Sequence, residues 1–294
     1  MPHAFVNGLN IHYQSAGRGP DLVIAHGFTA NSAFWYLTVV PSLRHDFRVT
    51  TYDLRGHGKS DMPQCGYTSA EMALDLRALM DHLGLVRIHL IGHSFGGEIA
   101  LQYAVLDPDR VQTLTLVDAR VRALQPRRPI SQWPRLQLAR QKIQELGIAM
   151  PVDRRKLTRD VLNELADSML SEMWDPDTGK EAFGPFGLGL WRRRAVEQWI
   201  RLFLTTTACQ DVMSVAGLTP GKVSLVQQPV LAIYGAKSRF LGTLTGLQRT
   251  LPNCKAVIVP EVGHFLPVAA PGVFLGHLRP FLEAQKNGAD APNI

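Results

Sequence analysis

The segment IHLIGHSFGGEIALQYAVL, residues 88–106, decides the fold of this chain. It begins with a short apolar run, turns at Gly92-x-Ser94-x-Gly96 and continues into a helical pattern over residues 98–106 that stops at an Asp-Pro pair. A serine on a sharp turn between a strand and a helix needs small residues on both sides, because larger side chains would collide with that strand and helix. The segment therefore predicts a strand, a tight turn and a helix, with the Ser94 hydroxyl exposed at the end of the strand.

Similar apolar runs lie on both sides of this segment and alternate with helical patterns. Residues 4–13 form a hairpin pattern around Asn7-Gly8, a dipeptide suited to a tight turn. Further short strands are expected at 22–25, 48–52, 111–117, 229–234 and 256–259, and helices at 70–83, 244–250 and 273–284. Strands that alternate with helices favour parallel pairing with both faces of the sheet covered. The sequence therefore predicts an α/β fold with a mostly parallel eight-stranded sheet and helices on both faces.

Residues 121–222 interrupt this alternation. They are rich in Arg, Leu, Gln and Glu, show helical periodicity and contain no convincing strand. We therefore expect a helical insertion after the sixth strand. The expected organisation is a core formed by residues 1–120 and 223–294, with residues 121–222 as a helical unit inserted between its two parts.

The composition is that of a globular enzyme, with 46% apolar and 19% charged residues. No apolar run approaches the ~20 residues of a membrane helix, and the start of the chain lacks a secretory pattern, so a cytoplasmic protein without a membrane span is expected. The three cysteines are scattered and predict no disulfide framework. No histidine pair has metal-ligand spacing, and Asp53 stands where a phosphate-binding loop needs glycine, so neither a metal nor a cofactor is expected.

The net charge of +6 could indicate a nucleic-acid partner, but its distribution argues against one. The whole excess of positive charge lies within residues 120–222, where the basic residues are scattered or in short clusters such as Arg192-Arg193-Arg194. The aromatic interleaving of a nucleic-acid module is missing. A solvated helical surface is the favoured interpretation, and a preference for anionic substrates or partners is the alternative.

A serine hydroxyl becomes a nucleophile when a base within hydrogen-bond reach accepts its proton, and histidine has the suitable basicity. Among the ten histidines, His264 follows the last expected strand and lies at the same sheet edge as the Ser94 turn. At that edge Phe28 follows the third strand, where its backbone N–H can pair with that of Phe95 to bind a developing oxyanion. Ser94 and His264 are therefore the candidate nucleophile and base.

Four motifs occur in the order and spacing of the α/β-hydrolase superfamily, which the chain resembles over nearly its whole length. They are His26-Gly27-Phe28, Asp53-Leu54-Arg55-Gly56-His57-Gly58-Lys59-Ser60, Gly92-His93-Ser94-Phe95-Gly96-Gly97 and Gly263-His264. The resemblance implies a serine hydrolase of the esterase or lipase type, in which residues 121–222 form a helical cap domain.

The third member of a Ser-His-Asp triad is less evident. Many members of the superfamily carry this acid in a Gly-x-x-Asp turn after the seventh strand, where this chain has Ser238. The second solution of the superfamily is an acid at the end of the sixth strand, which implies Asp118. Two alternatives stay open: Asp118 is only structural and the acid is missing, or another residue such as Glu261 supplies it.

These residues imply hydrolysis of a carboxylic ester, lactone or thioester through an acyl-enzyme. An apolar or aromatic part of a small-molecule acyl substrate is expected from the apolar residues of the cap, namely Trp133, Trp174, Phe183, Phe186, Leu188, Leu190, Trp191 and Phe203. The alternative is that these residues only pack the cap. Two other functions stay open, a slowly hydrolysing ligand sensor or receptor of the same fold and a C–C bond hydrolase. The sequence does not indicate an oligomeric state.

Overall fold

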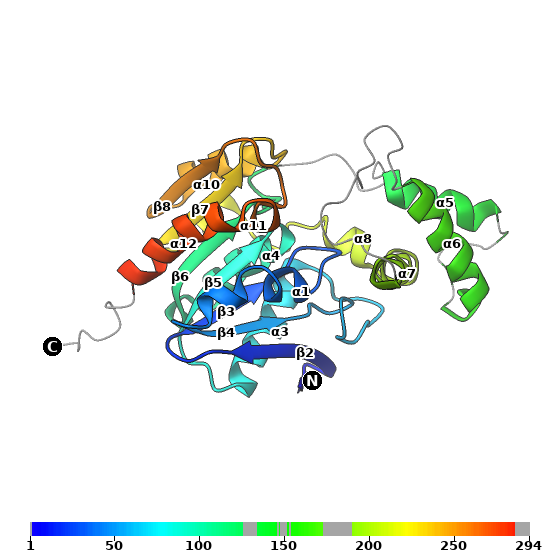
Figure 1. The fold of residues 1–294 in the computed structure, drawn as a ribbon, viewed down its shortest axis with the longest axis horizontal. Coiled ribbons are helices and arrows are strands. Elements are labelled where there is room, and N and C mark those ends of the chain that lie inside the picture. Colours follow the sequence, from blue (N-terminus) through cyan, green and yellow to red (C-terminus); the bar gives the residue numbers. More distant parts are fainter. Residues whose placement is uncertain are drawn as a thin grey trace.

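The computed structural model describes residues 2–125, 134–145, 147, 152, 154–172 and 190–285. Its centre is an eight-stranded sheet with the strand order β1-β2-β4-β3-β5-β6-β7-β8 (Figure 1). The strands are β1 (His3–Val6), β2 (Leu9–Ala16), β3 (Asp21–Ala25), β4 (Arg48–Tyr52), β5 (Ile88–His93), β6 (Val111–Val117), β7 (Val230–Gly235) and β8 (Cys254–Val259). Only β1 with β2 and β2 with β4 pair antiparallel. The predicted mostly parallel eight-stranded sheet is confirmed.

Helices cover both faces of the sheet. One face packs against α3 (Ser69–His82), α4 (Phe95–Leu106) and α10 (Leu241–Thr250), and the other against α1 (Ala33–Tyr36), α2 (Val40–Leu43) and α12 (Pro271–Ala284). Successive strand residues contribute to opposite faces, as the two-residue period of a strand requires. Leu90 of β5, for example, belongs to the core under α3 and α4, whereas Ile91 belongs to the core under α12.

Local sequence explains where several of these elements begin and end. The turn between β1 and β2 contains Asn7 and Gly8, both with positive φ, as the hairpin pattern predicts. Helix α3 begins with a capping box, because the Thr68 side chain accepts from the Glu71 N–H and the Glu71 carboxylate accepts from the Thr68 N–H. Helix α4 begins at Phe95, directly after Ser94, so that the nucleophile candidate is its N-terminal cap residue. The serine is therefore held between a buried strand and a buried helix.

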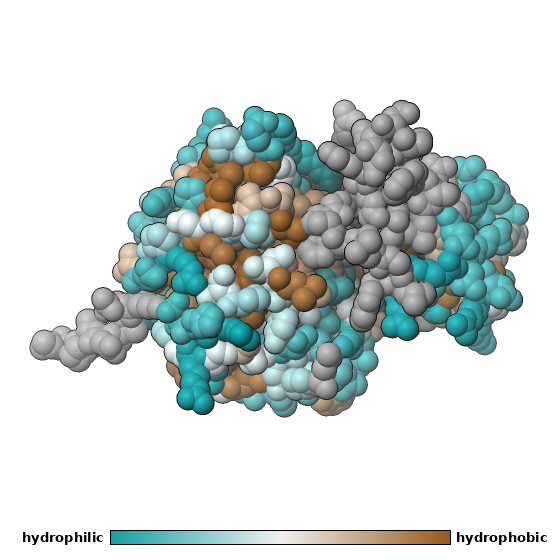
Figure 2. Space-filling view, in the orientation of Figure 1, coloured by the Kyte–Doolittle hydropathy of each residue, from teal (hydrophilic) through white to brown (hydrophobic). Residues whose placement is uncertain are grey.

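The described part of residues 121–222 contains helices and no strand. These elements are α5 (Pro134–Glu145), η3 (Arg154–Lys156), α6 (Arg159–Glu172), α7 (Leu190–Thr205), α8 (Ala208–Asp211) and α9 (Pro220–Val223). Helices α5, α6 and α7 share a small apolar core of their own, and α5 and α6 lie beside the sheet domain at one end of the molecule (Figure 1). Hydrophilic residues dominate the described surface at that end (Figure 2).

Helix α7 connects this helical unit to the loops at the carboxyl ends of the strands. The Trp199 Nε1–H donates to the carbonyl of Thr29 at 2.7 Å, and the Gln198 amide donates to the carbonyl of Gly58 at 3.0 Å. The Phe203 ring centroid lies 6.0 Å from that of Phe28. One side of α7 therefore lies directly over the loop that follows β3. Among the described residues, none of the helices has both the length and the apolar character needed to cross a bilayer.

The remaining elements are η1 (Pro108–Arg110), which follows α4, and α11 (Leu266–Ala269), which follows the loop after β8.

Candidate active site

The turn that carries Ser94 has a strained backbone. Ser94 has φ 55° and ψ −118°, a region that L-residues rarely occupy and that costs on the order of 1–3 kcal/mol. Its N–H donates to the Val117 carbonyl at 3.0 Å, and its carbonyl accepts from the Arg120 N–H at 3.0 Å. The end of β6 therefore holds the serine in this conformation from both sides.

Close backbone contacts require glycine on both sides of Ser94. A Cβ atom on Gly92 would lie 2.3 Å from the Gly96 carbonyl oxygen, and a Cβ atom on Gly96 would lie 2.4 Å from the His26 carbonyl oxygen. Both distances are far below a van der Waals contact, and the opposing atoms belong to the backbone. The Gly-x-Ser-x-Gly spacing is therefore a packing requirement of this turn.

Asp118 and His264 lie within hydrogen-bond distance of each other. Asp118 directly follows β6, is fully buried, and has its Oδ1 atom 2.9 Å from Nδ1 of His264. The Gly235 N–H donates to Asp118 Oδ2 at 3.0 Å. A carboxylate in this position accepts the Nδ1–H of His264, which leaves Nε2 of that ring free to accept a proton.

Ser238 stands in the turn after β7, the position at which many members of the superfamily carry the triad acid. Its side chain contacts Asp118. Its hydroxyl donates to Asp118 Oδ1. Because β6 and β7 are neighbours in the sheet, the ends of the two strands present both positions to the same histidine. Glu261, the other acid considered, has a side chain that is 84% exposed and pairs with Lys237.

His93 connects His264 to the turn that carries Ser94. Its Nε2 lies 2.9 Å from the His264 carbonyl oxygen, and the ring centroids of His93 and His264 are 4.7 Å apart. The Phe240 ring also packs against His264, with 4.7 Å between centroids. The base candidate thus contacts at least two other rings, one of which belongs to the residue that precedes Ser94.

The two residues expected to supply oxyanion N–H groups flank Ser94. Phe95 is the first residue of α4, and the N–H groups of the first helical turn have no acceptor within the helix. The loop of Phe28 comes so close to the serine that a Cβ atom on Gly27 would lie 3.0 Å from the Ser94 Cβ. The rings of Phe28 and Phe95 are 6.2 Å apart in an edge-to-face arrangement. The structure therefore brings Phe28, Phe95 and Ser94 together.

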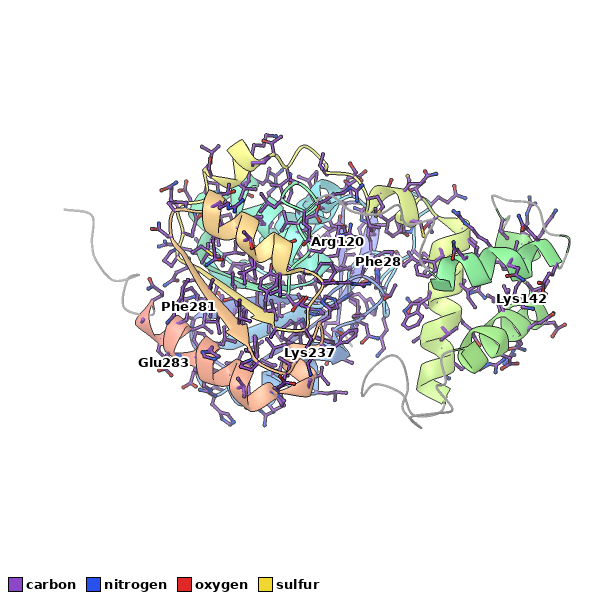
Figure 3. The ribbon with its side chains drawn as sticks, turned by 90° about the horizontal axis from the view of Figure 1, so that it is seen from above. Phe28, Arg120, Lys142, Lys237, Phe281 and Glu283 are labelled. Atoms are coloured by element: carbon purple, nitrogen blue, oxygen red, sulfur yellow. The ribbon has the colours of Figure 1, made fainter. Side chains whose placement is uncertain are left out.

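A buried cation lies behind Phe95. The Arg120 guanidinium carbon is 5.7 Å from the Phe95 ring centroid, and Arg120 is only 3% exposed. Figure 3 shows Arg120 and Phe28 on the side of the core that faces the helical unit. Arg120 also donates to the Val212 carbonyl. Burial lowers the pKa of Arg120, and the carboxylate of Glu98, which is fully buried in α4, offsets only part of this shift. Arg120 and Glu98 are thus two buried charged groups beside the start of α4.

Three residues that position the site were not identified from the sequence. His57 Nε2 accepts from the Thr29 N–H at 3.1 Å, and Asp53 accepts from the N–H groups of Ser32 and Lys59 at 2.7 and 2.9 Å. These contacts hold the loop next to Phe28. The three residues are Asp53, His57 and His93. In the sequence, Asp53 and His57 could have been found from the Asp-x-x-Gly-x-Gly-x-Ser pattern, and His93 from its position beside Ser94.

These buried histidines make the stability of the fold dependent on pH. Burial, and then the charge of a neighbouring histidine, lowers the pKa of His57 and of His93 to about 3. The unfolded chain binds protons at these groups below its pKa of ~6.5, whereas the folded chain does so only near pH 3. The stabilisation is therefore complete above pH 6.5 and is lost as the pH falls. Each group contributes a slope of ~1.4 kcal/mol per pH unit between these values.

We expect the free energy of unfolding to decrease between pH 6 and pH 5, and to decrease less steeply in a His57→Gln variant, by about 1.4 kcal/mol per pH unit. The glutamine oxygen can still accept from the Thr29 N–H but does not titrate. Urea unfolding at a series of pH values measures both slopes. Equal slopes for wild type and variant would contradict the assignment of a low pKa to His57.

Comparison with known proteins agrees with this architecture. A family model described as alpha/beta hydrolase fold matches residues 20–271. A soluble epoxide hydrolase from Corynebacterium sp. (strain C12) is 39% identical over 115 residues, which are 39% of this chain and 40% of that protein. The chain therefore matches about two fifths of the length of this curated relative.

Solved structures match over a greater length. The enol-lactonase from Burkholderia xenovorans LB400 superposes with a TM-score of 0.67 at 23% identity, covering 96% of this chain and 100% of the enzyme. A thermophilic esterase from Thermogutta terrifontis gives a TM-score of 0.67 at 24% identity, covering 95% of this chain and 94% of the esterase. At this identity the likeness concerns the fold, and the chemistry has to be argued from the residues of this chain.

Proposed function

Because the chain belongs to the α/β-hydrolase family, we propose that it is a serine hydrolase that cleaves a carboxylic ester or a related acyl bond. Ser94 is the nucleophile, His264 the general base and Asp118 the acid that orients the base. The observation that carries this proposal is the 2.9 Å contact between Nδ1 of His264 and Oδ1 of Asp118, next to the strained Ser94 turn.

The proposed reaction proceeds in two steps. The Ser94 Oγ attacks the substrate carbonyl carbon while Nε2 of His264 takes its proton, and the N–H groups of Phe28 and Phe95 stabilise the oxyanion. His264 then gives the proton to the leaving alcohol or thiol as the acyl bond breaks. In the second step His264 deprotonates a water molecule, which attacks the acyl-enzyme carbonyl carbon. His264 then returns this proton to Ser94 Oγ as the acyl bond breaks, which releases the carboxylic acid and the free serine. Asp118 stabilises the imidazolium in both steps.

One relative of this chain is named an epoxide hydrolase. The proposed serine nucleophile favours acyl hydrolysis over epoxide hydrolysis for this chain. Attack of a serine hydroxyl on an epoxide carbon would produce an ether at Oγ, a bond that water does not readily cleave. Attack on a carbonyl produces an ester, which water hydrolyses when a base and an oxyanion site are present. Ser94 therefore favours acyl substrates, among which esters, lactones and thioesters are all compatible with the same groups.

An apolar substrate part is supported by aromatic side chains beside Ser94. The ring of Phe28 lies 6.2 Å from that of Phe95 and 6.0 Å from that of Phe203, so residues from the core and from α7 form one aromatic cluster. We propose that residues 121–222 act as a cap whose α7 covers this cluster. Trp133, Trp174, Phe183, Phe186 and Leu188 lie outside the described residues, as do the side chains of Leu190 and Trp191.

Steady-state hydrolysis of p-nitrophenyl esters with acyl chains of two to eight carbons tests this proposal. We expect repeated turnover, with kcat/KM rising by roughly tenfold or more over the first added methylenes, because each is buried against the aromatic cluster. A C–C bond hydrolase would leave these esters largely unhydrolysed. A single slow burst of product with no further turnover would instead support a ligand sensor. The contact between Asp118 and His264 argues against a sensor, because it gives His264 the acid that a rapidly hydrolysing triad needs.

A further inference from the structure

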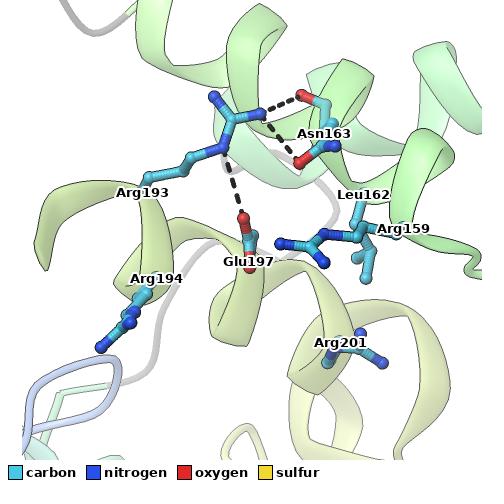
Figure 4. Close-up of a pocket in the computed structure, with 7 residues that line it drawn as sticks. All are labelled: Arg159, Leu162, Asn163, Arg193, Arg194, Glu197 and Arg201. Carbon is cyan, nitrogen blue, oxygen red and sulfur yellow. Dashed lines mark hydrogen bonds and ion pairs between the residues drawn. The ribbon is translucent and has the colours of Figure 1, made fainter. Parts of the chain in front are cut away.

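A basic groove lies between α6 and α7 and is lined by residues of both helices. Its volume is about 550 Å³, and Figure 4 shows its lining residues. Arg159 enters it from the first residue of α6, and Arg193, Arg194 and Arg201 enter it from α7. A second hollow of about 440 Å³ extends from Arg194 and Arg201 to Gly58 and Met62 in the core.

Only one of these arginines is neutralised within the described residues. Arg193 donates to Asp167. It also donates to Asn163, and its Nε lies 3.4 Å from Oε1 of Glu197 (Figure 4). Both nearby carboxylates are therefore engaged by the same guanidinium.

The other three arginines have no such partner. Arg159, Arg194 and Arg201 are exposed and form no ion pair with any described residue. On a protein surface whose charges only maintain solubility, positive and negative side chains are mixed. Three arginines without a partner around one groove repel one another, and a bound anion would remove this repulsion.

The shape of the groove and the residue type both indicate the class of anion. A guanidinium donates two parallel N–H bonds to phosphate oxygens, and arginine is the preferred residue for such groups. A volume of about 550 Å³ is far larger than a chloride ion needs and lies within the range of small-molecule sites. We propose that this groove binds a small soluble molecule through a phosphate ester or diphosphate group, held by Arg159, Arg194 and Arg201.

This site goes beyond the proposed hydrolase activity, and its lining residues include none of Ser94, His264 and Asp118. Arg194 and Arg201 line the groove and also the second hollow, where Gln198 donates to the carbonyl of Gly58. Trp199 of the same helix donates to the carbonyl of Thr29 in the core. The ligand would therefore contact the helix that covers the Phe28 loop without touching the reacting atoms. Binding requires neither Ser94 nor His264.

Isothermal titration of the full chain with inorganic pyrophosphate tests the proposal. We expect saturable binding by wild type that weakens as salt is added, and at least a tenfold weaker affinity in an Arg194→Gln/Arg201→Gln variant. The matched control is Arg87→Gln. Arg87 is also exposed and forms no ion pair with a described residue. It directly precedes β5, whereas Ser94 follows the other end of this strand. This control should bind as wild type does, and so should Ser94→Ala.

Two results would overturn the proposal. One is the absence of binding by wild type at millimolar pyrophosphate, and the other is equal affinity in wild type and the double variant. Sedimentation with vesicles of phosphatidylcholine and phosphatidic acid separates a soluble ligand from a lipid headgroup. Binding to these vesicles without binding to pyrophosphate would assign the groove to a membrane surface and contradict a soluble ligand. Because Ser94→Ala retains the groove, a failure of the hydrolase proposal would leave the binding result unchanged.

Discussion

Replacing Ser94 by alanine is expected to lower kcat for p-nitrophenyl ester hydrolysis by on the order of 10⁶-fold, to a small residual rate over water. The variant removes the only atom that forms the covalent bond, while the N–H groups of Phe28 and Phe95 remain in place. Alanine adds no atoms to the turn, so the contacts of Gly92 and Gly96 are unchanged. Steady-state kinetics measures the loss, and circular dichroism with thermal melting checks that the fold is kept.

A control for this result uses a serine outside the turn. Ser224 lies at the end of α9, where its hydroxyl donates to the Gly221 carbonyl at 2.9 Å. A Ser224→Ala variant should hydrolyse esters at the wild-type rate. If Ser94→Ala kept more than about one hundredth of wild-type kcat, a loss well short of that expected for a nucleophile, the nucleophile would have to be another residue.

Replacing Asp118 by asparagine is expected to lower kcat by roughly 10⁴-fold. An asparagine amide cannot stabilise the imidazolium, and its N–H₂ group favours the tautomer with the proton on Nε2, where it blocks acceptance of the serine proton. The loss is large because the carboxylate is fully buried and its partner atom is 2.9 Å away. The variant should bind substrate with a similar KM, so that the effect lies in kcat.

Two matched variants separate the possible acids. Ser238→Ala removes the hydrogen bond to Asp118 Oδ1 and the one that the hydroxyl accepts from the Phe240 N–H, and it should lower kcat by roughly tenfold or less. Glu261→Gln should leave kcat unchanged, because the Glu261 side chain is 84% exposed and pairs with Lys237. A collapse of activity in Glu261→Gln together with retained activity in Asp118→Asn would show that the acid has been assigned to the wrong residue.

The sequence predicts those parts of the fold and candidate site that depend on neighbouring residues. The Ser94 turn is an example, because the two glycines and the flanking strand and helix lie within a few positions of one another. Most of the eight strands are also predictable, since they are short apolar or β-branched runs, whereas β2 extends to Ala16 with the mixed sequence LNIHYQSA. The helix after Ser94 begins at Phe95, earlier than the helical pattern at 98–106 indicates, because Gly96 and Gly97 weaken the periodic signal although they lie within α4.

Contacts between distant segments are harder to predict. The hydrogen bond between Ser238 and Asp118 joins the ends of β6 and β7, and no local pattern shows that the hydroxyl stands beside the carboxylate. The same holds for His57, whose ring holds the loop of Thr29. The basic groove combines the start of α6 with one side of α7, so the excess charge in 120–222 indicates arginines there but not which of them converge.

The most direct test of the account is to find the acyl group on the protein. Rapid mixing with a p-nitrophenyl ester, quenching in acid and mass analysis of the peptides should locate one acyl group per chain on Ser94. In Asp118→Asn the same adduct should form more slowly. An acyl group on any other residue, or rapid turnover with no covalent adduct on Ser94 at the earliest times, would contradict the proposed mechanism.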